Sequence, residues 1–490
     1  MTPRGIEVLK KISCNAVGLD SEYTLATGEL KSRTYLDSTA STLRLQVVDD
    51  VLQHYLPHYS NTHSLLHFGA KLSTHEYAWV HDMVLEFVGA DPEAYTAFFV
   101  GQGTTASINR VAATLREKRP DRDMVATSIM EHHSNDLPHR KHFPEVVHVP
   151  ARMAKTSIGM VHLERLQEAL DTHGERVNYV AITGVSNVTG IINPIHEIAE
   201  MAHAVGALVV VDGAAMAAHQ PIKLSGHDNP ARNIDVLCFS GHKVYAPGSP
   251  GVVVTLKDLF ADIEPQVVGG GMVENVYLNR HTTLEKFPDR EEAGTPNICG
   301  AIGLGASLYA LNQVGMDTLA KEEARTIQYA LDRLSEIPNI IIYGETDGSL
   351  CKRAGALAFN LRDIEHGLTA AALNDYFGVA VRNECFCAHP YVREMITEVL
   401  AEEEDGLTDE ELEMMADLHR GMVRASFGIY STEKDVDTLA EALRHIANNR
   451  DYYIENYTRL DSGDYIHKTF QFDHSQLFSV RGAVDEWLEQ

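Results

Sequence analysis

Long apolar runs are absent from this sequence, and cysteines are few. No stretch approaches the roughly 18 uninterrupted apolar residues that a membrane-spanning helix needs, and the first residues, MTPRGIEVLKKISCNAVGLD, contain no apolar core of signal-peptide length. Six cysteines in a chain of 490 residues do not suggest a disulfide framework, and only Cys385 and Cys387 stand close together. We therefore expect a cytoplasmic protein with no membrane contact.

Basic residues are scarce as well. The chain has 41 Lys and Arg against 69 Asp and Glu, which gives a formal net charge of −28. A field of this sign repels phosphate backbones and anionic lipid heads, so we expect neither nucleic acid nor a membrane surface as a partner. The apolar fraction of 44% and the charged fraction of 22% are typical of a globular protein, and the length allows two or three domains.

Short apolar segments alternate with amphipathic ones between about residues 85 and 310. AYTAFFVG precedes TTASINRVAATLREKR, VNYVAITGVS precedes IHEIAEMAHAVG, and IDVLCFSG precedes PGVVVTL. Strand, helix and strand at this spacing predict βαβ units, and hence an α/β fold with a mostly parallel sheet flanked by helices. Because ligands bind at the carboxyl ends of such strands, the residues that follow each strand are the candidates for a functional site.

The pattern divides the chain into four parts. We expect an N-terminal segment over 1–34, a large domain over 35–314 and a small α+β domain over 315–448, which begins with the helical stretch MDTLAKEEARTIQYALDRLSEI. The remaining residues, 449–490, form a tail rich in Tyr and Phe to which the sequence assigns no role.

The first strand end carries a glycine-rich turn. GQGTT, Gly101 to Thr105, follows the strand AFFV and opens a helix. Glycines permit close backbone approach, and a helix N-terminus offers free N–H groups and a positive dipole end, which together suit a phosphate. An ordinary turn between strand and helix would look the same. The absence of a Gly-Lys-Ser/Thr sequence argues against a nucleoside-triphosphate P-loop.

Histidines crowd the next strand end. EHHSN, Glu131 to Asn135, follows MVATSIM, and His139 and His142 come shortly after. A single such histidine could be a hydrogen-bonded core residue, and the group could also bind a metal. His-His followed by His-x-x-His fits no common ligand spacing, however, and no acidic or cysteine set completes it, so we expect no metal site.

Three further polar side chains stand at strand ends. Asn187 comes just after YVAITGV, Asp212 after ALVVV and Lys243 after IDVLCFS. A buried carboxylate is costly without a cationic partner, which favours a cation facing Asp212 over a role as a helix cap. Lys243 is the single charged residue between Phe239 and Gly251, and it could be an ordinary surface lysine on a loop.

Together these side chains form the set that pyridoxal phosphate requires. A lysine whose pKa is lowered by desolvation can attack the cofactor's aldehyde. The pyridine nitrogen needs a carboxylate partner to stay protonated. A flat ring can stack on the cofactor, and Gly, Thr, Ser and His can bind its phosphate. In this interpretation, Lys243 is the residue that holds the cofactor.

The ordered motifs resemble the class V aminotransferase group of pyridoxal-phosphate enzymes, and most closely cysteine desulfurases and selenocysteine lyases. They run from YLDSTAST to VRASFGIYST and include GTTASIN, EHH, SNVTG, VDGAA, SGHK, GGGM, EEAGTPN and RNECFCAHP. The resemblance implies fold type I of the pyridoxal-phosphate transferases. This fold has a mostly parallel seven-stranded sheet flanked by helices and a smaller C-terminal α+β domain.

The resemblance also implies roles for individual residues. Lys243 is similar to the lysine that binds the cofactor covalently, Asp212 to the partner of the pyridine nitrogen, and His132 to the catalytic histidine that stacks on the ring. Asn187 matches an amide near the phenolic oxygen and the substrate. The residues that match cofactor-binding positions around the phosphate are Thr104, Thr105, Ser240 and His242.

Four residues are implied to act on substrate or across subunits. Thr295, in AGTP, resembles a residue that reaches the phosphate from the neighbouring subunit, which implies a homodimer with shared active sites. Arg424 matches the arginine that clamps the substrate carboxylate, and Arg382 is a second substrate-binding candidate. Cys387 matches the cysteine of the pattern Arg-x-Gly-x-x-Cys-Ala-x-Pro, which takes sulfur from the substrate as a persulfide. A protein that accepts this sulfur would then be a partner besides the small amino-acid substrate.

The sequence departs from the family pattern in three places. Ala215 stands where desulfurases have a Gln, so a hydrogen bond to the cofactor's phenolic oxygen is missing or replaced. Glu384 stands where the pattern has Gly, beside the expected nucleophile. An acidic insertion over 391–421 contains TDEELEMMADLHRG, which predicts a helix and could be a lid, a docking surface for a sulfur acceptor or a solvated helix.

We therefore expect a desulfurase that converts L-cysteine to L-alanine and leaves a persulfide on Cys387, with Lys243 as the base. A C–S lyase, an epimerase or an aminotransferase of the same group, with Cys387 not catalytic, is the alternative. CFC and the insertion also resemble molybdenum-cofactor sulfurases, although SGHK fits desulfurases better. A metalloenzyme built on the histidine cluster, or a catalytically silent scaffold, is the third interpretation.

Overall fold

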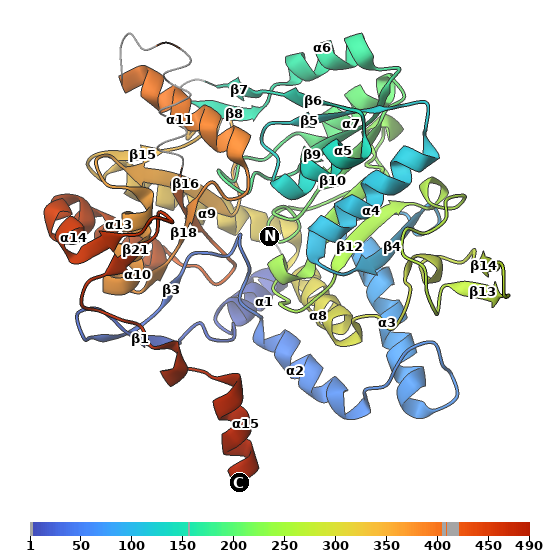
Figure 1. The fold of residues 1–490 in the computed structure, drawn as a ribbon, viewed down its shortest axis with the longest axis horizontal. Helices are drawn as coiled ribbons and strands as arrows, with labels where there is room; N and C mark the ends of the chain where they lie inside the picture. The colour runs from blue at the N-terminus through green and yellow to red at the C-terminus, as the bar shows by residue number, and fades with distance from the viewer. Residues whose placement is uncertain (1–2, 155–156, 404–407, 409–420) are drawn as a thin grey trace.

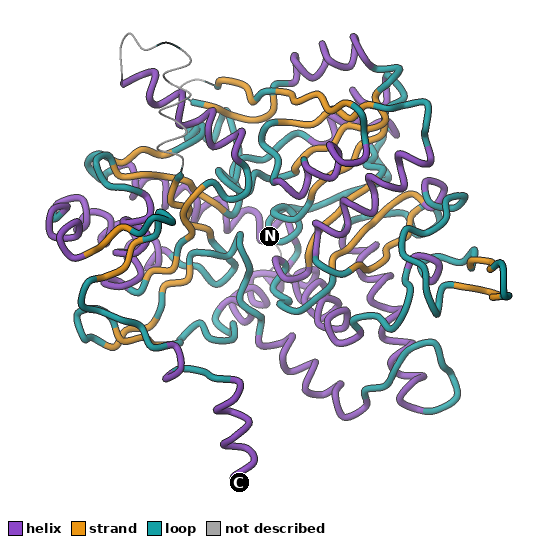
Figure 2. Tube along the Cα trace, viewed as in Figure 1, coloured by secondary structure: helices purple, strands orange, loops and turns teal. Residues whose placement is uncertain are grey.

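The protein has two lobes of unequal size. It is described from a computed structural model, whose described residues are 3–154, 157–403, 408 and 421–490. In Figure 1 the large lobe holds the central sheet, and the smaller lobe on the left holds a second sheet and the helices near the C-terminus. Figure 2 shows that helices lie outside the strands in both lobes. The C-terminus lies at the end of a helix that projects away from both lobes.

The large lobe is built on a seven-stranded sheet in the order β4-β12-β11-β10-β9-β5-β6. β12 pairs antiparallel with both of its neighbours, and the other strand pairs are parallel. This arrangement confirms the α/β fold and the mostly parallel seven-stranded sheet expected from the sequence. The strands are β4 (Tyr95–Val100), β5 (Met124–Ser128), β6 (Glu145–Val149), β9 (Val177–Thr183), β10 (Leu208–Asp212), β11 (Val236–Ser240) and β12 (Gly251–Leu256).

Alternate residues of each strand enter cores on opposite faces of this sheet, as the period of two in a strand requires. In β10, Val209 and Val211 belong to the core on one face, and Val210 belongs to the core on the other. All three are fully buried. Burial on both faces explains why the strand reads as an uninterrupted apolar run rather than as an alternating one.

Helices cover both faces of the central sheet. α4 packs against β11 and β12, and its Ile108, Val111 and Leu115 share a core with Phe98 of β4. On the other face, α8 packs against α2 and α3. The helices of this lobe are α1 (Pro3–Ser13), α2 (Gln46–Tyr55), α3 (Phe68–Phe87), α4 (Gly103–Lys118), α5 (Leu137–His142), α6 (Leu163–His173), α7 (Ile195–Ala204) and α8 (Ile298–Val314).

The small lobe has an antiparallel sheet of four strands in the order β15-β16-β19-β18. Its core joins Phe359 and Val423 of the sheet to Leu443 of α13. Thr432 and Asp435 form a capping box that starts α13. The elements are α9 (Met316–Ser335), β15 (Ile340–Ile342), β16 (Ala356–Leu361), α10 (His366–Phe377), β18 (Arg382–Glu384), α11 (His389–Glu403), β19 (Met422–Ser426) and α13 (Glu433–Asn448).

Five two-stranded pairs complete the described fold. Four are antiparallel hairpins, and the fifth, β3 with β17, is parallel and ties the N-terminal segment to the small lobe. The strands are β1 (Glu22–Thr24), β2 (Leu30–Ser32), β3 (Thr34–Tyr35), β7 (Ala151–Met153), β8 (Ile158–Val161), β13 (Val273–Val276), β14 (His281–Thr283), β17 (Val379–Ala380), β20 (Tyr457–Arg459) and β21 (Tyr465–His467).

The tail after residue 449 has a packed part and an exposed part. Tyr453 of α14 (Arg450–Asn456) and Tyr457 are buried in the small-lobe core. No residue of α15 (Val480–Glu489) is buried, and this helix projects from the body in Figure 1.

The expected insertion over 391–421 is described only in part. Residues 391–403 belong to α11, and the helix expected in TDEELEMMADLHRG lies outside the described residues apart from its first and last positions, Thr408 and Gly421. Among the described helices, no single one combines the length and apolarity needed to cross a membrane. α8 and α9 meet these criteria of length and composition only as a pair, bent by 80° at the break between them.

Candidate active site

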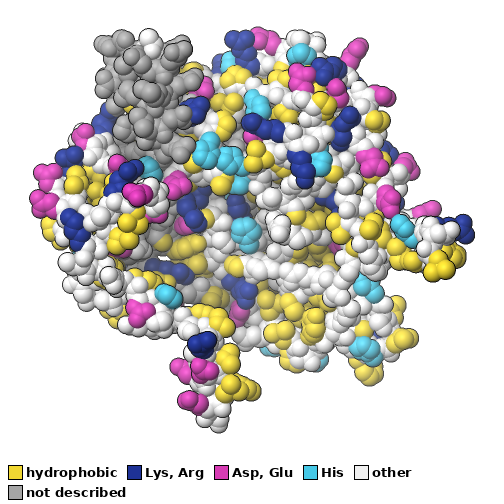
Figure 3. Space-filling model, in the orientation of Figure 1, with side chains coloured by type: hydrophobic (Ala, Val, Ile, Leu, Met, Phe, Trp, Pro, Cys, Tyr) yellow, Lys and Arg dark blue, Asp and Glu magenta, His cyan; other side chains and the backbone are white. Residues whose placement is uncertain are grey.

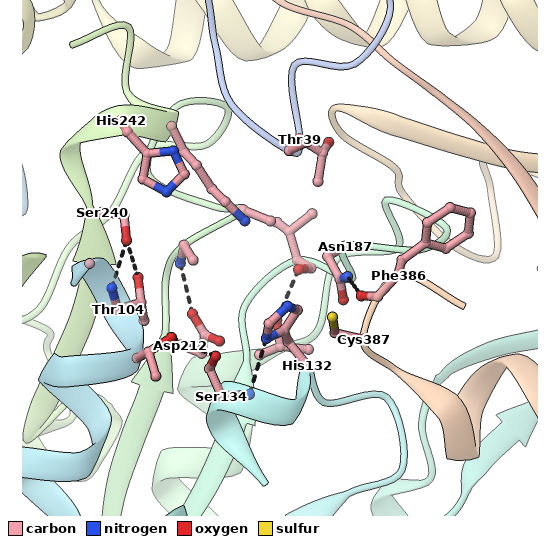
Figure 4. A pocket seen from close by; sticks show the side chains of 18 of the residues that line it. Thr39, Thr104, His132, Ser134, Asn187, Asp212, Ser240, His242, Phe386 and Cys387 are labelled. Carbon is pink, nitrogen blue, oxygen red and sulfur yellow. Dashed lines mark hydrogen bonds between the residues drawn. The ribbon is translucent and has the colours of Figure 1, made fainter. Parts of the chain in front are cut away.

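The carboxyl ends of the central strands and the facing edge of the small lobe enclose a cavity of about 530 Å³. Figure 4 shows side chains from both lobes around it. Eleven of the twelve site residues predicted from the sequence line this cavity, and Thr295 does not. The eleven are Thr104, Thr105, His132, Asn187, Asp212, Ser240, His242, Lys243, Arg382, Cys387 and Arg424.

The N-terminus of α4 forms a hydroxyl-rich wall of the cavity. The backbone N–H of Thr104 donates to Ser240 Oγ at 2.6 Å, and the two hydroxyls lie 2.7 Å apart. Thr105 Oγ1 lies 2.7 Å from Ser134 Oγ. Gly103 has φ +61°, and a Cβ there would lie 2.6 Å from Ser240 Oγ, so only glycine allows this close approach. Hydroxyls at the positive end of a helix are suited to an anion.

Asp212 ends β10 and is buried at the floor of the cavity. Its Oδ1 accepts a hydrogen bond from the backbone N–H of Ala214 at 2.9 Å, and a series of turns, not a helix, follows. Burial raises the pKa of this carboxyl, while the N–H of Ala214 and the charge of Lys243 oppose the rise. The cation that the sequence analysis expected for Asp212 is therefore Lys243.

Lys243 follows β11 in the short turn η4 (Gly241–Lys243) and lines the cavity. Burial lowers the pKa of its amine to about 8, and the charge of Arg424 adds to that effect, whereas Asp212 and Asp37 act in the opposite direction. Lys243 is thus a half-buried amine that exchanges protons near neutral pH, and not the exposed surface lysine of the alternative interpretation.

Both histidines of the cavity wall are held neutral. Burial, followed by the charge of Lys243, lowers the pKa of His132 and of His242 to about 4. His132 Nδ1 accepts a hydrogen bond from the backbone N–H of Ser134 at 3.0 Å, so the ring proton is assigned to Nε2. Figure 4 shows the His132 ring beside the cavity, on the side of Asn187 and Cys387.

The other histidines near this strand end do not converge on one point. His139 is buried, with Nδ1 2.8 Å from the Tyr179 hydroxyl, and is therefore a hydrogen-bonded core residue. His133 stacks on His389, and His142 lines a different hollow. Among the residues that the structure describes, no group of three or more His, Cys, Asp and Glu side chains is arranged to hold a metal ion.

Two arginines and one carboxylate form the small-lobe wall. Arg424 of β19 is buried and donates through Nη1 to the carbonyl of Asn187 at 2.8 Å. Asp37 pairs with Arg424 at 3.3 Å and with Arg382 at 2.9 Å. Arg424 Nε is buried and has no hydrogen-bond partner among the residues that the structure describes. Sequence reasoning missed Asp37, although it lies in the quoted motif YLDSTAST.

Cys387 closes the cavity on the side of the small lobe. It is exposed, and its backbone is left-handed with φ +56°. The preceding residue, Phe386, accepts a hydrogen bond at its carbonyl from Asn187 Nδ2 at 2.8 Å, and its ring lies 4.8 Å from the Arg424 guanidinium. Asn187 therefore holds both the cysteine loop and Arg424, which sequence alone did not indicate.

Thr295 lies in a second hollow of the same chain. Its hydroxyl accepts a hydrogen bond from Asn61 Nδ2 at 3.4 Å. This hollow shares Gln102 and Thr105 with the cavity, so it adjoins the anion-binding end of α4.

Comparison with known proteins identifies the relatives of this chain. The family model described as Aminotransferase class-V matches residues 34–439. A protein of Halalkalibacterium halodurans named probable cysteine desulfurase is 34% identical over 411 residues, which cover 84% of this chain and 92% of the relative. A cysteine desulfurase of an Enterobacter species is 34% identical over 415 residues, with 84% of this chain and 93% of the relative covered.

Solved structures of cysteine desulfurases have a similar fold. The apo structure of a cysteine desulfurase from Thermococcus onnurineus has a TM-score of 0.72 at 27% identity, and the alignment covers 85% of this chain and 95% of that one. A cysteine desulfurase from Escherichia coli has a TM-score of 0.68 at 28% identity, with 86% and 95% covered.

Proposed function

The chain belongs to the aminotransferase class-V family, and on this premise we propose that it is a pyridoxal-phosphate-dependent cysteine desulfurase. The proposed reaction moves the sulfur atom of L-cysteine to Cys387 as a persulfide and releases L-alanine. The observation that carries the proposal is that a cysteine, a half-buried lysine and a buried arginine line one cavity, at Cys387, Lys243 and Arg424.

The described residues fit pyridoxal phosphate. Thr104, Thr105 and Ser240 would bind the phosphate at the positive end of α4. The buried carboxylate of Asp212 would face the pyridine nitrogen, and the amine of Lys243, whose pKa is lowered to about 8, would bind the aldehyde. When bound, this cofactor withdraws electrons from the substrate's α-carbon, which allows the α-proton to leave.

Arg424 and Arg382 would hold the carboxylate of the substrate. Arg424 is buried and has one N–H without a partner among the described residues, so it has a donor to offer. Asp37 pairs with both arginines and leaves the two guanidinium groups with one net positive charge. One net charge matches an amino acid with one carboxylate and a neutral side chain, as L-cysteine is.

Lys243 is the proposed base for the α-proton. With a pKa of about 8, its amine can both accept and return a proton near neutral pH. Cys387 is the proposed nucleophile for sulfur. The Cβ–S bond of L-cysteine breaks, a new bond joins that sulfur to Cys387 Sγ, and the substrate's Cβ gains a proton to become the methyl group of alanine.

We also propose that the protein works as a homodimer and that a second protein or small thiol accepts the sulfur. Thr295 lies outside the cavity of its own chain, in a second hollow that Thr105 also lines. The same residue of a second copy could complete the phosphate site from outside. Cys387 is exposed, so an acceptor thiol can approach its persulfide.

The test supplies the protein, reconstituted with pyridoxal phosphate, with L-cysteine and a thiol reductant, and measures alanine, sulfide and pyruvate. Desulfuration gives alanine and sulfide in equal amounts, and Cys387→Ala abolishes both. Cys14→Ser is the matched control, because Cys14 is also exposed but lies outside the cavity. Pyruvate with ammonia as the main products would instead establish β-elimination by a C–S lyase.

A further inference from the structure

Two thiols stand next to each other on the small-lobe side of the cavity. Cys385 and Cys387 are separated by Phe386 alone, and neither is in a disulfide. Cys387 is exposed and lines the cavity, whereas Cys385 is only 8% exposed and does not line it. The reaction proposed above uses Cys387 and leaves Cys385 without a role.

Cys385 lies at one end of a line of three side chains. Its Sγ is 2.9 Å from Nε2 of His389, and Nδ1 of His389 is 2.9 Å from Nε2 of His133. The two imidazole rings are parallel within 2°, with centroids 4.8 Å apart. The backbone N–H of His133 donates to the carbonyl of Cys387 at 2.7 Å, which ties the line to the cysteine loop.

This line has the arrangement of a nucleophile, a base and a group that orients the base. Burial and the neighbouring His389 lower the pKa of His133. In the tautomer in which His133 Nε2 accepts, His389 carries its proton at Nδ1 and directs the lone pair of Nε2 at the Cys385 thiol. The thiol nearer the cavity, Cys387, has no such base in the contacts described.

We propose that Cys385 is a second sulfur-carrying thiol, which takes the outer sulfur from the persulfide of Cys387. This inference rests on the proposed desulfurase function, which supplies that persulfide. His389 Nε2 removes the thiol proton of Cys385, and the thiolate attacks the outer sulfur. A bond forms between that sulfur and Cys385 Sγ, and the sulfur–sulfur bond to Cys387 breaks. Cys387 leaves with the electron pair and recovers a proton from His389, so nothing is oxidised or reduced.

The backbone span between the two cysteines is compatible with contact between their sulfur atoms. Cα atoms two residues apart are at most about 7 Å apart in any chain, and this span is close to the range that a direct sulfur–sulfur bond tolerates. Phe386, between them, has φ +51°. A left-handed residue turns the chain and brings its two neighbours closer than in an extended strand.

The transfer has a measurable consequence. Once its sulfur has moved to Cys385, Cys387 is a free thiol again and can attack a second molecule of L-cysteine before any acceptor arrives. Each chain then stores two sulfur atoms, one of them on a thiol that is shielded from solvent thiols by burial.

The first experiment mixes the holoenzyme with a small excess of L-cysteine and no reductant, stops the reaction at short times, and measures alanine per chain. The wild type releases two molecules of alanine per chain, and Cys385→Ser releases one. Cys299→Ser is the control, because Cys299 is a half-buried thiol that makes no contact with Cys385, His389 or His133 in the interactions described. This variant should still release two molecules of alanine per chain. His389→Gln slows release of the second alanine by roughly 100-fold, which is the lower end of the range expected for loss of a positioned base. It leaves the rate of release of the first alanine unchanged.

Mass spectrometry of the alkylated peptide that contains both cysteines locates the sulfur. One added sulfur atom on each cysteine supports the inference. Two sulfur atoms on Cys387 with none on Cys385, or a disulfide between the two cysteines with release of sulfide, would overturn it.

A second experiment tests the transfer without the proposed activity. A small-molecule persulfide donor replaces L-cysteine and loads the protein directly. Sulfur should reach Cys385 in the wild type but not in Cys387→Ala, because Cys385 takes its sulfur from the persulfide of Cys387. Direct loading of Cys385 in Cys387→Ala, or no loading of it in the wild type, would contradict the inference. If the first experiment gave no alanine but the second showed sulfur transfer from Cys387 to Cys385, only the desulfurase function would be refuted.

Discussion

At the scale of a single residue, burial lowers the pKa of the Lys243 amine and so sets the pH at which it reacts. The pKa of its amine falls from 10.5 to about 8 because the charged form loses water on burial. Only the neutral amine attacks an aldehyde, and below the pKa its fraction rises tenfold with each pH unit. The folded-state pKa therefore places the change in reactivity near pH 8 and not near 10.5.

We predict that the apo protein takes up pyridoxal phosphate at a rate that rises with pH up to about 8 and then levels off. Asp212→Asn moves the levelling to lower pH, because the charge of Asp212 raises the pKa of Lys243. Absorbance at the bound cofactor's band, with borohydride trapping to confirm the residue, follows the uptake. A rate that continued to rise through pH 10 would mean that Lys243 is solvated like a surface lysine.

Glu384 is a second residue whose local setting can be tested. Its φ is +89°, a region that glycine enters freely and that costs other residues about 1–2 kcal/mol. Glycine in turn costs about 0.5–1 kcal/mol more chain entropy. The family pattern that the sequence resembles has glycine here, and glycine adopts this φ without that cost.

Glu384→Gly is therefore expected to raise the free energy of unfolding by about 0.5–1 kcal/mol. The matched control is Asn383→Gly in the same strand, where φ is not positive and the change should destabilise by a similar amount. Urea denaturation measures both. A loss of stability in Glu384→Gly equal to that of the control would show that the positive φ carries no strain.

Among the described α-helices, α15 differs from the others in that none of its residues is buried. Val480, Val484, Trp487 and Leu488 are between 51% and 72% exposed. By contrast, Tyr453 in α14 is 1% exposed and its hydroxyl lies 2.9 Å from His445 Nδ1. The fold of the small lobe therefore depends on α14 but not on α15.

Deletion of residues 479–490 should leave the free energy of unfolding within about 0.5 kcal/mol of the wild type, as expected for exposed positions. Tyr453→Ala should reduce it by about 3–4 kcal/mol, because it leaves a cavity in the core. Thermal and urea denaturation compare the two variants. If the deletion lowered stability in a way that depended on protein concentration, α15 would belong to an interface between chains.

At the scale of the whole molecule, the surface carries clusters of exposed apolar side chains, whose contact with water is unfavourable. Val276, Tyr277 and Leu278, at the tip of the β13–β14 hairpin, are 69%, 52% and 109% exposed. Leu66 and Phe68, before and at the start of α3, are more than 90% exposed. Figure 3 shows apolar side chains on the hairpin at the right and along the lower edge. Exposed apolar patches of this kind mark surfaces for association.

Light scattering after gel filtration should therefore give a mass about twice the 54.2 kDa of one chain. Leu278→Asp should shift the protein toward the monomer, because it places a charge in the apolar contact. Trp487→Asp, at an exposed position of α15, is the control and should not. A monomeric wild type at all concentrations would remove the proposed role of Thr295 across subunits.

The sequence alone determined the fold class and most of the side chains that line the cavity. Local periodicity revealed the alternation of strands and helices, because a strand repeats every two residues and a helix every 3.6. Parallel strands align their carboxyl ends at one edge of a sheet. For that reason Thr104, Asp212 and Lys243 could be placed together from their positions after strands, and the structure puts them on one cavity.

Only the tertiary structure decided the contacts between distant segments. Asp37 meets Arg424 across 387 residues of chain, and His389 meets His133 across 256. No local pattern predicts such pairs, because the packing of the small lobe against the large one sets which side chains approach. The same packing buries Cys385 and exposes Cys387, two residues apart, and so gives two adjacent thiols different chemistry.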